Sequence, residues 1–246
     1  MIDTHCHIDL YQNPTKIALQ TEQEKITTIL VTNLPSLFEK SYPHTRGFKY
    51  IRLALGLHPL MADLHNKEKK LFEKLVDKTS YIGEVGLDFS VNGEATKSIQ
   101  IESFRFVLNV IKNKPKFISI HSRKAESAVL DILDEEKRVP GVLHWYSGST
   151  SELDRAVSKG HYFSINPAMV NSKSGKKIID RIPPERILTE TDGPFVKLNN
   201  TKVLPKDVSI VENYLAILWS KDKNEVSQVI KNNFYKLIHP LILNKK

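Results

Sequence analysis

The chain has 246 residues, of which 40% are hydrophobic and 26% charged, the balance of an ordinary globular protein. No apolar run approaches the roughly eighteen residues of a membrane span, and no basic-then-apolar leader precedes the first apolar run, so we expect a cytoplasmic protein without a membrane partner. A single cysteine, Cys6, excludes an internal disulfide and suits a reducing compartment. The formal net charge of +8 favours an anionic partner such as nucleic acid.

Eight short apolar runs recur along the chain, with segments of helical periodicity between them. Near-continuous apolar runs of this length are typical of parallel strands that are buried on both faces. The runs cover residues 2–4, 26–31, 51–55, 81–83, 117–120, 141–143, 162–165 and 187–189. Eight strands that alternate with helices predict an α/β fold, a single-domain (β/α)8 TIM barrel over residues 1–246.

The helical segments have signals of their own. Residues 101–111 and 125–133 each place apolar side chains on one face of a helix. Ser149, followed three residues later by Glu152, is a capping-box pattern that predicts the start of a helix. Two further helical patterns lie around residues 208–219 and 226–238.

Imidazole and carboxylate side chains come where the predicted strands end. In a (β/α)8 barrel the residues that carry out chemistry lie at the carboxyl ends of the strands, which meet at one mouth. His5 and His7, two positions apart in the first strand, would point to the same side. The full set of predicted metal ligands is His5, His7, Glu84, His121, His144 and Asp192.

Imidazole and carboxylate ligands without thiolates suit Mg, Mn or Zn. Six ligands are too many for one tetrahedral ion, so we expect two divalent ions, with Glu84 as the bridging carboxylate because the fourth strand lies opposite the first. Two such ions would lower the pKa of a bound water, and the resulting metal-bound hydroxide would attack the phosphorus of a phosphodiester. Asp192 is expected to orient this water or to take its proton, so Glu84 and Asp192 are the predicted catalytic residues.

Other polar residues near the strand ends are expected to support this centre. Asp88 and Glu190 are predicted to orient ligand imidazoles by hydrogen bonds. Arg123, two positions after His121, is expected to contact phosphate. His58, in the segment LGLHP, either contacts the substrate or a carboxylate next to the ligands, or has a structural role.

Three segments after the strands are predicted to be long loops at the mouth, at residues 89–97, 166–177 and 193–206. Their lysines are Lys97, Lys173, Lys176, Lys177, Lys197, Lys202 and Lys206. We expect Lys173, Lys176 and Lys177 to contact substrate phosphates, while solvated surface lysine remains the alternative for any one of them.

Seven motifs in this order, MIDTHCHIDL, LGLHP, IGEVGLDF, HSRKA, HWYSGS, YFSIN and LTETDGPF, resemble those of the TatD family of metal-dependent deoxyribonucleases. The resemblance runs from one end of the chain to the other. It implies a TIM barrel, a divalent-metal centre and hydrolysis of DNA phosphodiesters, often by exonucleolytic trimming. Carried over motif by motif, it assigns the metal to the same six ligands.

Two segments depart from the usual family pattern. After the final Asp-x-Pro the family continues into a basic Arg-Gly-Lys-x-Asn-x-Pro segment, whereas PFVKLNNTKVLPKD follows Gly193 here. The Phe of the usual HCFSG segment is Tyr146, preceded by Trp145. This divergent pattern resembles the TatD-like nuclease of the Qat anti-phage defence system, which implies protein partners from a defence operon.

Two other functions are compatible with the same residues. One is an amidohydrolase-type enzyme that cleaves C–N or ester bonds with a similar metal pair. The other is a non-catalytic metal-binding subunit of a defence complex. For a nuclease we expect single-stranded DNA or frayed ends as the substrate, because a duplex is too wide for the mouth of a barrel.

Overall fold

The structure is a computed structural model that describes residues 1–137 and 140–243, the last three of them by their backbone only. Eight strands alternate with helices in chain order. The strands are β1 (Ile2–Cys6), β2 (Thr27–Leu30), β3 (Ile51–Leu53), β4 (Tyr81–Gly86), β5 (Phe117–His121), β6 (Val142–His144), β7 (Tyr162–Ile165) and β8 (Ile187–Thr189). Each overlaps one of the predicted apolar runs.

The eight strands pair in parallel and form a barrel in two hydrogen-bonded sheets, β1-β2-β3 and β4-β5-β6-β7-β8. A bridge between Leu55 and Ile82 joins the sheets at β3 and β4. Contacts also join β8 to β1: the Thr4 hydroxyl donates to the carbonyl of Thr189 at 3.0 Å. The predicted (β/α)8 TIM barrel is therefore confirmed.

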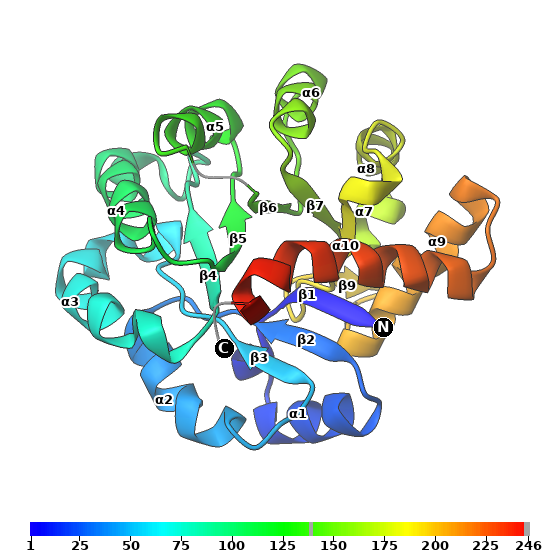
Figure 1. Cartoon of the computed structure of the whole chain (residues 1–246), viewed down its shortest axis with the longest axis horizontal. Coiled ribbons are helices and arrows are strands. Elements are labelled where there is room, and N and C mark those ends of the chain that lie inside the picture. Colours follow the sequence, from blue (N-terminus) through cyan, green and yellow to red (C-terminus); the bar gives the residue numbers. More distant parts are fainter. Residues whose placement is uncertain (138–139, 244–246) are drawn as a thin grey trace.

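The helices form a ring outside the strands (Figure 1). They are α1 (Pro14–Gln23), α2 (Pro35–Thr45), α3 (His65–Leu75), α4 (Lys97–Val110), α5 (Glu126–Glu135), α6 (Thr150–Ser158), α7 (Pro167–Val170), α8 (Lys173–Ile179), α9 (Val208–Trp219) and α10 (Lys223–Leu243). Because helices cover the outer face of the strands and side chains fill the inner one, β1 and β6 are buried along their whole length. The predicted cap of α6 is present, with the Ser149 hydroxyl accepting the Glu152 N–H at 3.2 Å.

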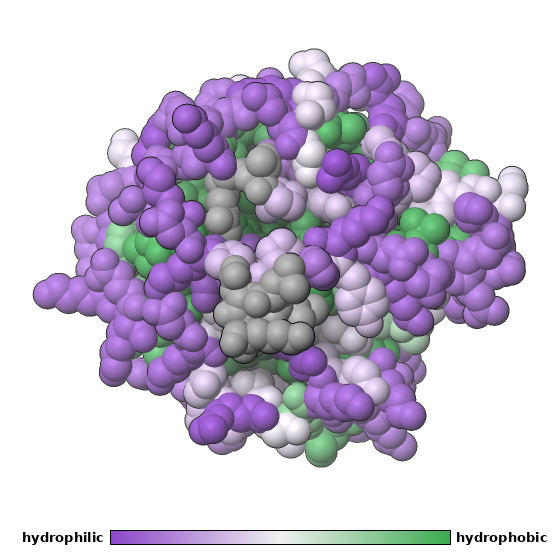
Figure 2. All heavy atoms as spheres, in the orientation of Figure 1, coloured by the Kyte–Doolittle hydropathy of each residue, from purple (hydrophilic) through white to green (hydrophobic). Residues whose placement is uncertain are grey.

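Helix α10 covers the end of the barrel opposite the strands' carboxyl ends, and Figure 1 shows it lying across the strands. Asn233 donates to the carbonyls of Pro184 and Ile187, at 2.7 and 2.8 Å, where β8 begins. Phe234 packs on Phe117, the first residue of β5, with ring centroids 6.1 Å apart. On this face, hydrophilic side chains cover most of the outer helices and apolar ones appear in small separate patches (Figure 2). Within the described residues, no helix combines the length and the apolar character needed to cross a membrane.

The three predicted long loops contain regular structure, so that expectation is wrong in part. Residues 166–177 include α7 and most of α8, each begun by a side-chain cap, from Asn166 and from Ser172. Residues 193–206 include a two-stranded hairpin, β9 (Lys197–Leu198) and β10 (Thr201–Lys202). Asn199 and Asn200 form its turn with φ of 47° and 62°, the left-handed region that asparagine tolerates better than most residues.

Candidate metal centre

The end of β1 contributes two imidazoles to the interior of the barrel mouth. His5 and His7 alternate with Cys6 along an extended chain, so they point to the same side. Both are buried, and their Nε2 atoms are 3.3 Å apart. The alternation that the sequence indicated is therefore present.

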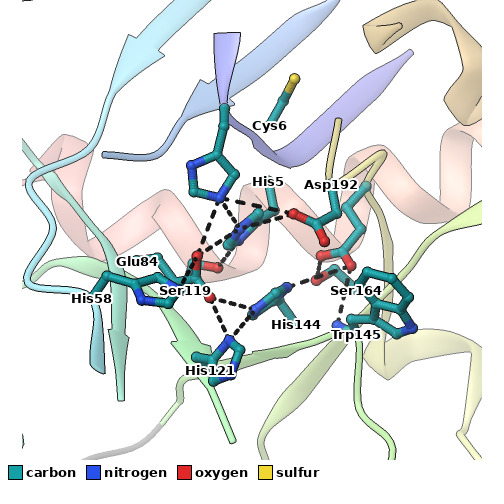
Figure 3. A network of polar contacts seen from close by, with 12 residues as sticks. His5, Cys6, His58, Glu84, Ser119, His121, His144, Trp145, Ser164 and Asp192 are labelled. Carbon is teal, nitrogen blue, oxygen red and sulfur yellow. Dashed lines mark hydrogen bonds and ion pairs between the residues drawn. The ribbon is translucent and has the colours of Figure 1, made fainter. Parts of the chain in front are cut away.

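Glu84 of β4 lies at the centre of a cluster of imidazoles (Figure 3). Its Oε2 atom is 3.4 Å from Nε2 of His5 and 3.2 Å from Nε2 of His7. Its Oε1 atom is 2.6 Å from Nδ1 of His121 and 2.8 Å from Nε2 of His144. Each carboxylate oxygen therefore faces two of the predicted imidazole ligands.

His58 also lies against this cluster. Its Nε2 atom is 3.3 Å from Oε2 of Glu84, and its Nδ1 accepts the backbone N–H of Leu60 at 3.1 Å. Its ring centroid is 5.2 Å from that of His121. A fifth imidazole thus contacts the same carboxylate.

Asp192 follows β8 and completes the predicted set. Its Oδ1 atom is 3.7 and 3.8 Å from Nε2 of His5 and His7, and its backbone N–H donates to the carbonyl of His5 at 2.9 Å. The residue has a left-handed φ of 49°. At Gly193 a Cβ atom would lie 1.9 Å from the hydroxyl of Tyr11, so only glycine fits this turn.

Two neighbours fix which ring nitrogen faces the cluster. Nδ1 of His5 is 2.7 Å from the hydroxyl of Ser119, which leaves Nε2 facing Glu84. Nε2 of His121 is 2.8 Å from Oδ2 of Asp88, which leaves Nδ1 facing Glu84. Asp88 therefore has the position expected of a residue that orients a ligand imidazole.

Glu190 holds the ends of three strands together rather than bonding to an imidazole. Its side chain accepts the backbone N–H of Trp145 at 3.1 Å, the amide of Asn166 at 3.0 Å and the hydroxyl of Ser164. Nδ1 of His144 is 3.7 Å from its Oε1 atom, which is longer than a hydrogen bond. Glu190 is fully buried and adds negative charge beside His144.

Asp3 is a further buried carboxylate that the sequence reasoning missed. It accepts the backbone N–H of Thr191 at 2.9 Å and its hydroxyl at 2.6 Å, which ties β1 to the segment that carries Asp192. Burial raises the pKa of Asp3 to about 8. The available signal was strand alternation, because Asp3 stands two positions before His5, as Ser119 stands two before His121.

The donor set fits divalent metal ions. Three groups of side chains each bring one ligand atom within 4.8 Å of the others: His5 with His144 and Asp192, His5 with His7 and Glu84, and His58 with Glu84 and His121. Imidazole nitrogens also face one another, at 3.2 Å between His121 and His144. Imidazole nitrogens suit Zn, and the carboxylate oxygens of Glu84 and Asp192 suit Mn or Mg as well.

Charge is distributed unevenly over the two central carboxylates. Burial by itself would raise the pKa of Glu84, but the surrounding imidazoles, His58 and His144 foremost, hold it well below its ordinary value. Burial raises the pKa of Asp192 well above its ordinary value, and the nearby carboxylates of Glu190 and Glu84 add to the effect. The imidazoles thus stabilise the ionised form of Glu84, whereas burial stabilises the protonated form of Asp192.

The predicted phosphate contacts lie outside this cluster. Arg123 is exposed just after β5. Lys173, Lys176 and Lys177 lie on α8 instead of a loop, and Nζ of Lys176 is 5.6 Å from the centre of the Tyr214 ring on α9. The structure therefore brings the six predicted ligands together but does not join these lysines to them.

Residues 2–239 match the family described as TatD related DNase. The chain belongs to the TatD-related DNase family. This confirms the family resemblance of the seven motifs. This match does not distinguish the nuclease of an anti-phage system from other members of the family.

Relatives in the TatD-related family cover nearly the whole chain. An uncharacterized metal-dependent hydrolase of Methanocaldococcus jannaschii is 31% identical over 240 residues, which are 94% of this chain and 94% of that protein. The deoxyribonuclease TATDN3 of Homo sapiens is 26% identical over 264 residues, covering 98% of this chain and 95% of that protein. The crystal structure of a TatD homologue from Escherichia coli K12 has the same fold, with a TM-score of 0.86 at 22% identity over 96% of this chain and 97% of that chain.

Proposed function

We propose that this protein is a divalent-metal-dependent hydrolase that cleaves phosphodiester bonds of DNA, trimming a strand from its end. The observation that carries this proposal is the position of Glu84 among the imidazoles, with two of the predicted ligand histidines on each carboxylate oxygen. Glu84 would hold divalent ions together with these imidazoles. Family membership and the human relative named a deoxyribonuclease support DNA as the substrate.

Six side chains would hold the two ions. They are His5, His7, Glu84, His121, His144 and Asp192. When bound, divalent ions such as Mg, Mn or Zn supply positive charge to the phosphate and lower the pKa of a water molecule.

The side chains themselves have three tasks in this reaction. Ser119 and Asp88 hold the imidazoles of His5 and His121 in the orientation that presents a free nitrogen. Asp192 accepts the proton of the attacking water on its carboxylate, and its backbone bond to the His5 carbonyl keeps that carboxylate beside the cluster. The scissile phosphate would lie between these groups and the mouth.

Substrate binding is proposed to involve residues outside the ligand set. His58, which contacts Glu84, would touch the phosphate that is cleaved. Arg123, Lys173, Lys176 and Lys177 would neutralise phosphates further along the strand. The narrow mouth of a barrel favours a single strand or a frayed end over a duplex.

We also propose a biological setting. The divergent motifs support a role in anti-phage defence, in the cytoplasm and together with protein partners from the same operon. A plaque assay on cells that carry the whole operon tests this. Protection should disappear with Asp192→Asn, and undiminished protection would contradict the proposal.

The nuclease proposal is tested with end-labelled single-stranded and duplex DNA in the presence of Mg, Mn or Zn. We expect a ladder that shortens from one end, abolished by EDTA and reduced at least a hundredfold by Asp192→Asn. Asp131→Asn, at an exposed ion pair on α5, is the matched control and should retain full activity. If DNA is not cleaved while lactones or cyclic amides are, the amidohydrolase alternative is correct.

A further inference from the structure

Exposed apolar side chains gather in the segments that follow the strands. Of the ten large hydrophobic residues that are exposed in the described part of the chain, six lie in such segments: Leu10, Leu60, Leu64, Val91, Trp145 and Phe195. These segments surround the mouth of the barrel, where the candidate metal centre lies. Exposed apolar side chains that gather around a site often mark a surface that binds a ligand or a partner.

Trp145 is held at the edge of the cluster by its backbone. It directly follows His144, and its N–H donates to Glu190 at 3.1 Å. Its left-handed φ of 38° is unfavourable for a bulky residue, so the structure maintains it against a local cost. The side chain remains 36% exposed, and Figure 3 shows the ring at the edge of the cluster, beyond His144 and Ser164.

Phe195 lies against the metal centre and is open to solvent at the same time. Its ring meets that of His7 edge to face, with centroids 5.0 Å apart and planes at 86°. Its backbone N–H donates to the carbonyl of Asp192 at 2.9 Å, which fixes the ring near the predicted ligands. Even so, 56% of the residue is exposed. A planar group stacked on this ring would be adjacent to the candidate metal centre.

Two lysines without an acidic partner lie in the hairpin that follows Phe195 in the chain. Lys197 of β9 and Lys202 of β10 are directly opposite each other in the hairpin, whose turn projects their side chains to the same face. Like charges in this position repel. No carboxylate in residues 1–137 or 140–243 forms an ion pair with either lysine, and both are exposed. Lys197 is two residues from the exposed ring of Phe195, and Lys202 is opposite Lys197. Unneutralised cations and an exposed ring in one segment favour a ligand that combines an aromatic group with a phosphate.

We propose that Trp145 and Phe195 stack on unpaired bases of the substrate strand while Lys197 and Lys202 bind its phosphates. The proposal rests on the proposed nuclease function and names the residues that select single-stranded substrate. Aromatic side chains combined with a cationic track are the usual means of binding single strands without sequence preference. The lysine pair favours this ligand over an apolar protein surface, which would leave both charges without a counterion.

Binding is tested first, in EDTA so that no turnover occurs. The chain has two tryptophans, so Trp219→Phe leaves Trp145 as the sole tryptophan reporter. We expect oligothymidylate to quench its fluorescence, and an abasic strand of equal length and charge to bind at least about tenfold more weakly. Equal affinity for the two strands, or no change of fluorescence with either, would overturn the proposal. The exposed apolar residues around the mouth would then be assigned to contact with a protein partner.

Kinetics then separate this inference from the nuclease function itself. Trp145→Ala and Phe195→Ala should each lower kcat/KM by about tenfold or more on single-stranded DNA relative to kcat/KM on the abasic strand. Trp145→Phe should restore most of the loss, and Ile217→Ala, at an exposed position on α9, should change neither rate. Equal losses on both strands would contradict the stacking proposal but not the nuclease function. Absence of cleavage by the native protein would contradict the nuclease function, and the fluorescence test of stacking would still be valid.

Discussion

At the scale of single residues, the site is specified by which nitrogen of each imidazole is already engaged. Ser119 takes Nδ1 of His5, and Asp88 takes Nε2 of His121, so opposite ring nitrogens of the two histidines face Glu84. The position of a histidine in the sequence can predict that it is a ligand, but not which of its two ring nitrogens faces the metal centre. That choice depends on a neighbour from another strand.

His161 is a buried imidazole outside the site, and it makes stability depend on pH. Its Nδ1 accepts the backbone N–H of Gly141 at 3.2 Å, and burial lowers its pKa from 6.5 to about 4. Between these pH values the unfolded chain binds the extra proton, so the free energy of unfolding falls as pH falls from 6.5 to 4, by roughly 3 kcal/mol from this group. Urea unfolding at pH 7, 5.5 and 4 measures the effect.

The matched variants for this measurement are His161→Asn, whose amide oxygen can still accept the Gly141 N–H, and His44→Asn at an exposed position. We expect the first to lower the loss of stability between pH 7 and pH 4 by about 2–3 kcal/mol and the second to leave it as in the native protein. An unchanged loss in His161→Asn would show that His161 is not the titrating group.

At the scale of elements, helix α10 closes the base of the barrel while the hairpin and short helices build the mouth. Helix α10 contacts the first residues of β5 and β8. The opposite end of β5 carries His121, and the opposite end of β8 leads to Asp192. The helix therefore stabilises the framework of the site from the opposite end.

Phe234 and Tyr235 are neighbours on α10 with opposite environments. Phe234 is 3% exposed and packs on Phe117, whereas Tyr235 is 57% exposed. We expect Phe234→Ala to lower the free energy of unfolding by about 3–5 kcal/mol and Tyr235→Ala by no more than about 0.5 kcal/mol. Chemical denaturation of the two variants makes the comparison, and similar losses would rule out α10 as a major part of the core.

Helix α8 carries the lysines that were expected on a loop. If Lys173, Lys176 and Lys177 contact phosphates, changing all three to Gln should lower the slope of log K against log salt by about 2 for a single strand. The matched control changes Lys223, Lys231 and Lys236 of α10, on the opposite end of the barrel, and should leave the slope unchanged. An unchanged slope in the α8 variant would assign those lysines to the solvated surface.

At the scale of the whole molecule, buried charge is concentrated at one end of the barrel. His5, His7, Glu84 and Asp192 are each at most 4% exposed, around a space that suits a cation. Burial of this many polar groups is unfavourable until they are coordinated. Metal binding should therefore stabilise the folded protein as a whole.

We expect Zn or Mn at a hundred times its dissociation constant to stabilise the protein by about 2.7 kcal/mol, which raises Tm by roughly 5–10 °C for a chain of this size. Differential scanning calorimetry with metal and with EDTA measures this shift. Glu84→Gln should lose most of it, while Glu73→Gln, exposed on α3, should retain it. A Tm that is the same with metal and with EDTA would contradict a metal centre held by these residues.

The sequence by itself determined the strands, the barrel and the set of residues that meet at its mouth, because apolar runs, alternation and motifs are local patterns. Only the tertiary structure decided the contact of His58 with Glu84, the role of Glu190 and the bond between Asp3 and Thr191. The last two residues are 188 positions apart. Contacts of this kind depend on how the strands close around one axis, and no local pattern records those distances. The helix α8 and the β9–β10 hairpin were missed for a different reason, since their caps and turn are single polar residues that also occur in loops.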